Sequence, residues 1–307
     1  MNSMIYSPEG LQQKTEALSL SALEHAKNTK QILEAKAVMC DSDHNLIVDL
    51  GEIKGIIPRE EAAIGIKDGS VKDIAVLSRV NKQICFKVNN IISDGTKTIA
   101  SLSRLSAQQD ALEHMLATYS KGDVIPAKIT HLEPFGAFAD IGCGIVGLIS
   151  IENISVSRIS HPKDRFHVGQ NILTVIKDID KQQKRFSLSH KELLGTWEEN
   201  AALFSVGQTV CGKIRSIEDY GIFIELTPNL AGLAEYRENT YPGQQATVYI
   251  KNIIPEKMKI KLSIIDHFSA EPQTEEEEPY TYFFTGKHMD CFTYSPACCE
   301  KLIQTMF

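Results

Sequence analysis

Two phenylalanines near the middle of the chain have the clearest potential for recognition chemistry. Phe135 and Phe138 flank a glycine in the stretch PFGAF, between two runs in which apolar and polar residues alternate. Such alternation predicts β-strands, so the rings would stand at a turn between strands. Rings exposed at a turn can stack on nucleobases. The alternative is that both rings are ordinary core residues, and this stretch alone does not decide between the two.

Basic side chains accompany these rings, namely Lys128, Arg158, Lys163, Arg165 and Arg185. Cations beside stacking rings would neutralise the phosphates of a single strand. The whole chain carries a net charge of −7, but most of the acidic excess lies after residue 270, and bases outnumber acids from residue 121 to 190. A local positive field of this kind attracts phosphates even on an acidic protein.

Other potentially reactive residues are weaker candidates. His288, Cys291, Cys298 and Cys299 invite a zinc interpretation, but they lack a CxxC pair, and adjacent cysteines do not readily share one tetrahedral ion. The chain shows no Gly-rich phosphate loop, HExxH motif or nucleophile elbow. We therefore predict no metal, no cofactor, no small-molecule substrate and no catalytic site. We interpret Trp197 as a packing residue between domains.

The composition predicts a cytoplasmic protein. Seven scattered cysteines are an odd number and suit free thiols better than a disulfide framework. No apolar run approaches the ~20 residues of a membrane helix. The start, MNSMIYSPEG, does not have the basic and apolar regions of a signal peptide.

The pattern of strands, turns and helical stretches predicts a mainly β chain with three barrels. In the first barrel we expect one of the strands at Ala75–Val80. The predicted segments are an N-terminal helix at 1–33, a divergent barrel at 34–104, a linker helix at 105–120, a second barrel at 121–190, a linker helix at 191–204, a shortened third barrel at 205–266, an acidic linker at 267–279 around Glu275–Glu278, and a C-terminal extension at 280–307 that looks like a hairpin followed by a helical turn.

Comparison of the chain with itself shows that the central stretch is repeated. Three glycines recur at one offset of 85 residues, namely Gly122, Gly136 and Gly147 as Gly207, Gly221 and Gly232. The closing Leu188-Ser189 recurs as Leu262-Ser263 after only 74 residues, so the third copy is shorter, and it lacks the segment around VSRISHPKDRF. The first copy has His44 and Ile47 in place of the aromatic pair, whereas the third keeps Tyr220 and Phe223. Rings kept in two copies and absent from one favour a functional surface over a core.

The stretch GDVIPAKITHLEPFGAFADIGCGIVGLISIENIS, with the later DKQQKRFSLS, resembles the S1 RNA-binding domain. The glycine turn, the Gly-Leu after the third strand and the closing Leu-Ser fall in register, and all three copies share the resemblance, over about residues 30 to 266. It implies tandem five-stranded barrels of the OB-fold type. The order of the copies is similar to that of a short, three-repeat member of the bacterial ribosomal protein S1 family, of the clostridial type. In that family the leading domains anchor to the ribosome rather than reading RNA.

The resemblance also assigns individual residues. The family's stacking aromatics fall on Phe135, Phe138, Tyr220 and Phe223. The basic residue of its last strand falls on Arg185 and Lys259, and the acid that ends its fourth strand falls on Asp180. The family's frequent His after Gly-Leu falls on Ser150 and Glu235, so neither copy keeps it, and Glu235 would repel phosphate. The set expected to contact RNA is completed by Lys128, Arg158, His161, Lys163 and Lys213.

These observations predict a protein that binds single-stranded RNA or mRNA and acts in translation. We expect it to recruit mRNA to the small ribosomal subunit, which residues 1–104 would contact. The middle barrel would be the main RNA binder and the third an auxiliary. Two alternatives stay open: a general RNA chaperone or RNA-decay accessory, and a protein-docking scaffold with weak RNA affinity.

Overall fold

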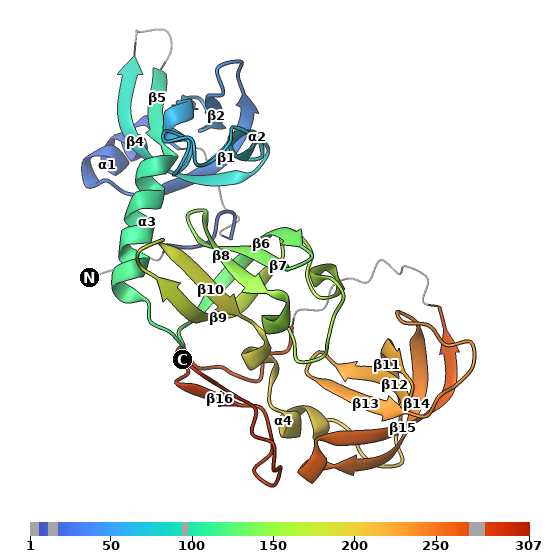
Figure 1. Ribbon diagram of the computed structural model, residues 1–307. Coiled ribbons are helices and arrows are strands. Elements are labelled where there is room, and N and C mark those ends of the chain that lie inside the picture. The colour runs from blue at the N-terminus through green and yellow to red at the C-terminus, as the bar shows by residue number, and fades with distance from the viewer. Residues whose placement is uncertain (1–5, 12–17, 94–97, 270–279) are drawn as a thin grey trace.

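Three closed five-stranded barrels follow one another in the computed structural model, which describes residues 6–11, 18–93, 98–269 and 280–307 (Figure 1). Counted along the chain, the strands of each barrel lie in the order 1-2-3-5-4, and the fourth strand pairs with the first to close the barrel. The third and fifth strands run parallel, and the other neighbours are antiparallel. The predicted fold class, mainly β with three tandem OB-type barrels, is confirmed.

The strands of the three barrels have matching positions in the repeat. The first barrel contains β1 (Leu33–Cys40), β2 (Leu46–Asp49), β3 (Lys54–Ile57), β4 (Gln83–Ser93) and β5 (Thr98–Ser103). The second contains β6 (Val124–Glu133), β7 (Gly136–Gly142), β8 (Ile145–Ser150), β9 (Asn171–Asp180) and β10 (Arg185–Ser189). The third contains β11 (Thr209–Glu218), β12 (Gly221–Thr227), β13 (Leu230–Ala234), β14 (Gln245–Ile254) and β15 (Lys259–Phe268).

The repeated Gly-Leu and Leu-Ser motifs are two sides of one packing contact. A Cβ placed on Gly147 would overlap the side chain of Leu188, which β10 brings beside β8. Gly232 stands in the same relation to Leu262 in the third barrel. Each barrel therefore needs a glycine on its third strand to make room for the leucine of its fifth, which explains why the two motifs recur together.

Short helices and turns connect the strands. The α-helices are α1 (Leu20–Thr29), α2 (Ile74–Leu77), α3 (Arg104–Thr118) and α4 (Trp197–Ala201), and the 3-10 turns are η1 (Arg59–Glu61), η2 (Ile151–Asn153), η3 (Pro162–Asp164), η4 (Lys191–Leu194) and η5 (Pro255–Lys257). The linker at 191–204 is thus two short pieces, η4 and α4, with Gly195 in a positive-φ conformation between them. None of the described helices is both long and apolar enough to cross a bilayer.

Two predicted elements of the first 80 residues are wrong. Among the described residues of this segment the helix is α1 alone, since residues 7–11 are coil and turn and the chain already enters β1 at Leu33. The strand expected at Ala75–Val80 is instead the helical turn α2. Its amides bond locally, from Leu77 to Asp73 and from Ser78 to Ile74, and only Val76 is buried. The alternating apolar residues that suggested a strand here belong to a helical turn that buries only one of its sides.

The N-terminal segment fastens the first barrel to the second. Glu9 lies between them, with its backbone N–H donating to Asp140 of β7 at 2.8 Å and its carboxylate accepting from the Cys85 amide of β4 at 3.1 Å. Arg104 at the start of α3 donates to both Glu9 carboxylate oxygens, at 2.7 and 2.9 Å. Burial works to raise the pKa of Glu9, but the charge and hydrogen bonds of Arg104 outweigh it and hold the pKa below its usual value. This buried ion pair fixes the approach of the two barrels.

The C-terminal extension packs across the second and third barrels (red in Figure 1). It forms a hairpin of β16 (Cys291–Thr293) and β17 (Gln304–Met306), and the helical turn expected after the hairpin is wrong. The Tyr282 hydroxyl accepts from the Leu173 amide of β9 at 3.0 Å, and the Tyr294 hydroxyl donates to the Asn229 carbonyl of the third barrel at 2.6 Å. Trp197 of α4 is buried in the hydrophobic core that also contains Tyr294, so it is the packing residue that we predicted. The acidic run of the linker lies outside the described residues.

Candidate nucleic-acid interface

The aromatic pair of the second barrel lies on its surface. Phe135 stands in the turn between β6 and β7 and is 55% exposed, and Phe138 on β7 is half-buried. The rings meet edge to face, with centroids 6.0 Å apart and planes at 89°. The backbone at Gly136 fits closely against β8, where a Cβ would overlap the Ile149 carbonyl. The turn thus holds one ring out in solvent, where a base can stack on it.

The third barrel repeats this geometry. Tyr220 precedes β12 and is 70% exposed, while Phe223 on β12 is half-buried. Their centroids are again 6.0 Å apart with planes at 89°. In the first barrel the corresponding Ile47 is 7% exposed and His44 occupies a left-handed turn position. Two barrels therefore present a pair of rings, and the first buries its counterpart.

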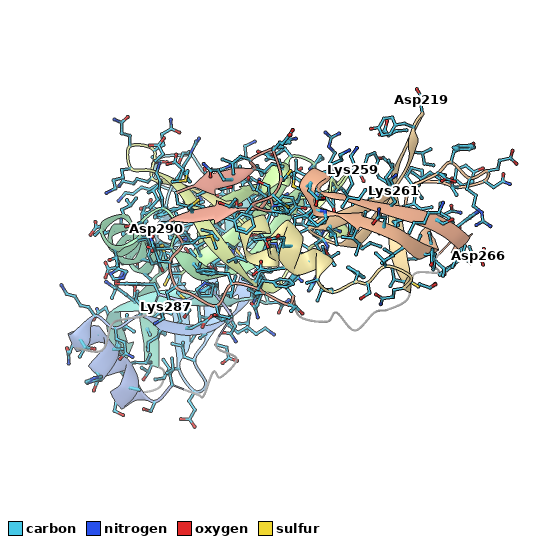
Figure 2. All side chains as sticks on the ribbon, turned by 90° about the horizontal axis from the view of Figure 1, so that it is seen from below. Asp219, Lys259, Lys261, Asp266, Lys287 and Asp290 are labelled. Atoms are coloured by element: carbon cyan, nitrogen blue, oxygen red, sulfur yellow. The ribbon has the colours of Figure 1, made fainter. Side chains whose placement is uncertain are left out.

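A row of outward-facing residues continues across the sheet from each pair. In the second barrel Phe138 pairs with Leu148 and Leu148 with Ser187, and the exposed Arg185 lies two residues before Ser187 on β10. In the third barrel the same row runs from Phe223 through Leu233 to Lys261. Lys259 lies two residues earlier on β15, and Figure 2 labels both lysines on this strand. The predicted cations of the last strand thus lie near the rings.

Lys261 was not among the predicted residues. It occupies the position of Ser187, and both are exposed. The apolar-polar alternation of KIKLS on β15 places Lys259 and Lys261 on one face, and that pattern could have identified it. The third barrel therefore carries one more cation in this row than the second.

A lysine in a β-bulge of the fourth strand was also missed. Lys177 lies where the pairing of β9 with β10 shifts, and Lys251 lies at the matching shift between β14 and β15. A bulge re-aims the side chain of its extra residue. The Lys177 ammonium donates to Asn153 Oδ1 at 3.0 Å, and the Asn153 amide donates to Ser150 Oγ at 2.7 Å. The lysine thereby reaches the predicted site at Ser150.

The third barrel has the acidic Glu235 at the position of Ser150 in the second barrel. The Lys251 ammonium forms an ion pair with Glu235 at 3.1 Å, so the carboxylate predicted to repel phosphate has a cationic partner. In the second barrel Ser150 donates instead to Glu152 at 2.7 Å, and this hydrogen bond lowers the pKa of Glu152. Each barrel therefore has one lysine and one carboxylate here, but the carboxylate of the third barrel, Glu235, occupies the position of Ser150, whereas that of the second, Glu152, lies two residues later.

Several predicted residues have structural partners. The Lys128 ammonium donates to the carbonyls of Glu9 and Gly10 at 3.2 and 3.4 Å, so it holds the N-terminal segment. Asp180 accepts from the amides of Gln182 and Gln183, both at 2.9 Å, and shapes the turn that leads to Arg185. These contacts give Lys128 and Asp180 positioning roles, whatever they do toward RNA.

The remaining predicted residues are distributed more widely. His161 Nδ1 accepts from the Lys163 amide at 3.1 Å and caps η3, while the Lys163 side chain points outward. Arg158 is exposed in the segment between β8 and β9. Lys213 is half-buried on β11 opposite Glu225. The structure brings the rings and last-strand cations together, and it places this second group outside that row.

Comparison with known proteins fits this arrangement. Residues 118–191 match the family of the S1 RNA binding domain. The middle barrel therefore matches the S1 RNA-binding domain family along its whole length. Its match covers β6 to β10, which carry Phe135, Phe138 and Arg185. No group of three or more potential metal ligands occurs within the part of the chain that the structure describes.

Beyond the S1 domain itself, the chain is similar to small ribosomal subunit protein bS1. It is 30% identical to the protein of Staphylococcus aureus strain COL over 262 residues, which is 80% of this chain and 64% of that relative. It is 29% identical to the protein of Staphylococcus haemolyticus strain JCSC1435 over 294 residues, 91% of this chain and 72% of the relative. The chain thus spans under two thirds of the length of the S. aureus relative.

Among solved structures, a multidomain protein with nucleic acid binding domains from Streptococcus pneumoniae TIGR4 matches with 13% identity and a TM-score of 0.26. The match covers 76% of this chain and 73% of that one. A superposition this limited supports no statement about function.

Proposed function

We propose that the chain binds single-stranded RNA through the ring pairs of its second and third barrels. The observation that carries the proposal is the repeated edge-to-face pair, which has the same spacing and angle in both barrels. Stacking on aromatic side chains contributes roughly 1–3 kcal/mol per base and tolerates any sequence. The cations beside the rings, Arg185 in one barrel and Lys259 with Lys261 in the other, lie where they can neutralise phosphates.

We further propose that the protein acts in translation, in the cytoplasm, by holding mRNA at the small ribosomal subunit. The support is the similarity to bS1 proteins along most of the chain. Stacking and phosphate neutralisation need no proton transfer or nucleophile, so the proposed activity is binding and not catalysis. Because the first barrel has the buried Ile47 where the other barrels have a half-buried ring, we assign the ribosome contact to the first barrel, within residues 1–104.

Binding of fluorescent oligouridylate to the full chain tests the RNA proposal. The variant that combines Phe135→Ala with Phe138→Ala should bind more weakly because it removes the exposed ring and its partner. The matched control is Tyr241→Ala, since Tyr241 is an exposed ring in a loop of the third barrel. Equal affinity of the double variant and the control would refute the stacking proposal.

Sedimentation with purified small ribosomal subunits tests the second part. The full chain should sediment with the subunits, and the double phenylalanine variant should do so as well, because the proposed anchor is the first barrel. Strong RNA binding without sedimentation would favour a general RNA chaperone or RNA-decay accessory. Sedimentation without measurable RNA affinity would favour a protein-docking scaffold.

A further inference from the structure

A groove of about 440 Å³ lies between the second barrel and the C-terminal hairpin. One wall is the segment after β8, with Ile151, Val156 and Ile159. The opposite wall comes from the hairpin, with Phe292 and Ile303. The groove therefore exists only because the C-terminal extension packs beside the S1 domain, and its size suits one small organic group.

Hydrogen bonds hold both walls in place. Tyr294, also in the lining, accepts at its carbonyl from the Trp197 amide at 3.0 Å and donates its hydroxyl to Asn229. The Thr305 hydroxyl donates to Glu192 at 3.0 Å. On the other wall, the Ser157 amide donates to the Pro228 carbonyl at 3.1 Å. The groove is thus formed before any ligand arrives, which lowers the ordering cost of binding.

Cations stand at the rim of this apolar groove. Arg158 lines it and is exposed, and no ion pair of its side chain occurs among the described residues. Lys191 also lines it, with its ammonium donating to the Glu152 carbonyl at 3.1 Å. The Glu152 carboxylate is the opposing charge in the lining, and it accepts from Ser150. Two cations, one carboxylate and an apolar floor fit a ligand with a flat apolar body and an anionic group.

The lining of the groove begins next to the backbone of the ring pair in the second barrel. The Ile151 amide donates to the Phe135 carbonyl at 2.9 Å, so the lining begins at a residue bonded to the backbone of the exposed ring. A strand that stacks a base on Phe135 has its next nucleotides beside this opening. The third barrel has a shorter connection, from Ala234 to Gln245, where the second has Ser150 to Asn171.

We infer that the groove binds a further nucleobase of the same RNA strand, with its phosphate at Arg158 or Lys191. This rests on the proposed single-stranded RNA binding and extends it to a site built by the C-terminal extension. Adenine or uracil supplies the flat body, and the backbone phosphate supplies the negative charge. The S1 domain and the hairpin then read one continuous strand, and the extension gains a role in binding.

A length series of oligouridylates, measured on the full chain, tests the inference. The groove variant combines Arg158→Met with Ile303→Ser, and the matched control combines Lys67→Met with Leu302→Ser, which change exposed residues outside the lining. The groove variant should bind the shortest oligonucleotides as the control does. For oligonucleotides long enough to reach the groove, the groove variant should bind about tenfold more weakly than the control. A loss of this magnitude is expected when one base contact is removed. Thermal unfolding of both variants checks that the fold is intact.

The outcomes separate this inference from the proposed function. If the groove variant matches the control at every length while Phe135→Ala with Phe138→Ala weakens binding, the groove inference fails and the proposed function stands. If neither variant changes RNA affinity, the proposed function fails as well. If the groove variant keeps its RNA affinity but no longer sediments with ribosomal subunits, the groove belongs to a protein contact, and the inference is overturned.

Discussion

Arg165 of the second barrel and Glu225 of the third form an ion pair with a nitrogen–oxygen distance of 2.5 Å, and both side chains are nearly buried. Glu225 also accepts from Arg215 on its own barrel, at 2.7 and 3.1 Å. Arg215 reaches Asp164 of the second barrel at 3.4 Å. This network fixes the two barrels that carry the ring pairs, so both pairs are held in one relative orientation.

The first prediction concerns this network. Glu225→Gln leaves two arginines nearly buried without their carboxylate, and loss of one partner from a buried ion pair costs roughly 3–5 kcal/mol. We expect the unfolding free energy of the full chain to fall by about 3 kcal/mol, as measured by urea denaturation. The control is Glu218→Gln, which changes an exposed residue on β11. Equal stability of the two variants would show that the network does not hold the barrels.

The second prediction ranks the two ring pairs. Phe135→Ala with Phe138→Ala should weaken oligouridylate binding more than Tyr220→Ala with Phe223→Ala, because the third barrel has a carboxylate, Glu235, where the second has the uncharged Ser150. Point variants suit this comparison better than deletion of a barrel, since the C-terminal extension packs on both. The reverse order in the same titration would make the third barrel the main binder.

The third prediction isolates Glu235 itself. Its removal leaves the Lys251 ammonium free to meet a phosphate, so Glu235→Gln should strengthen RNA binding by up to about fivefold. The effect should be read in the Phe135→Ala and Phe138→Ala background, where the third barrel dominates. Glu256→Gln is the control, because Glu256 is an exposed acid in the turn before β15. An unchanged or lower affinity would argue against phosphate binding at Lys251.

Much of the barrel architecture was predictable because its determinants are local or repeated. The strands β9 (Asn171–Asp180) and β10 (Arg185–Ser189) are marked in the sequence by alternating apolar residues on both sides of a charged turn. The Gly147–Leu188 contact was visible in the sequence only as two motifs that recur together, and the structure shows that they meet between β8 and β10. Repetition supplied the long-range information that a single stretch does not contain.

Other features depend on contacts between distant segments, and sequence patterns did not reveal them. Lys128 has the side chain expected of a phosphate ligand. Its ammonium instead donates to the carbonyl of Glu9, which lies 119 positions away in the chain. In the sequence Lys177 is one of several basic residues of the second barrel. Its contact with Asn153 depends on the bulge of β9, which the sequence pattern does not reveal. The aromatic residues of the C-terminal extension show no strand or helix periodicity in the sequence. Their positions depend on contacts with the second and third barrels.

The fourth prediction tests Lys177 as a phosphate ligand. Each phosphate neutralised in a single strand contributes about −0.7 to the slope of log affinity against log salt. Lys177→Met should therefore make that slope shallower by about 0.7 while preserving the fold. Lys67→Met, an exposed lysine of the first barrel, is the control. A slope equal to that of the control would assign Lys177 a purely structural role through Asn153.

The last prediction concerns acid stability. His190 is fully buried against Phe166, Tyr280 and Tyr282, and its Nδ1 lies 3.1 Å from the Ile154 carbonyl. Burial, helped by the charge of Arg165, lowers the pKa of His190 to about 4. The unfolded chain binds this proton near pH 6.5, so between pH 6.5 and 4 the unfolded state holds more protons than the folded state. The stability contributed by neutral His190 is complete above pH 6.5 and is lost as the pH falls to about 4.

The size of this loss is on the order of 3 kcal/mol. His190→Phe keeps a ring in the cluster but cannot titrate, so its urea midpoint should decline less between pH 6.5 and 4 than that of the unmodified chain. His25→Gln is the control, because His25 is exposed on α1 and its removal leaves the fold unchanged. If His190→Phe retains the full decline, the acid sensitivity arises from other groups, and burial does not lower the pKa of His190.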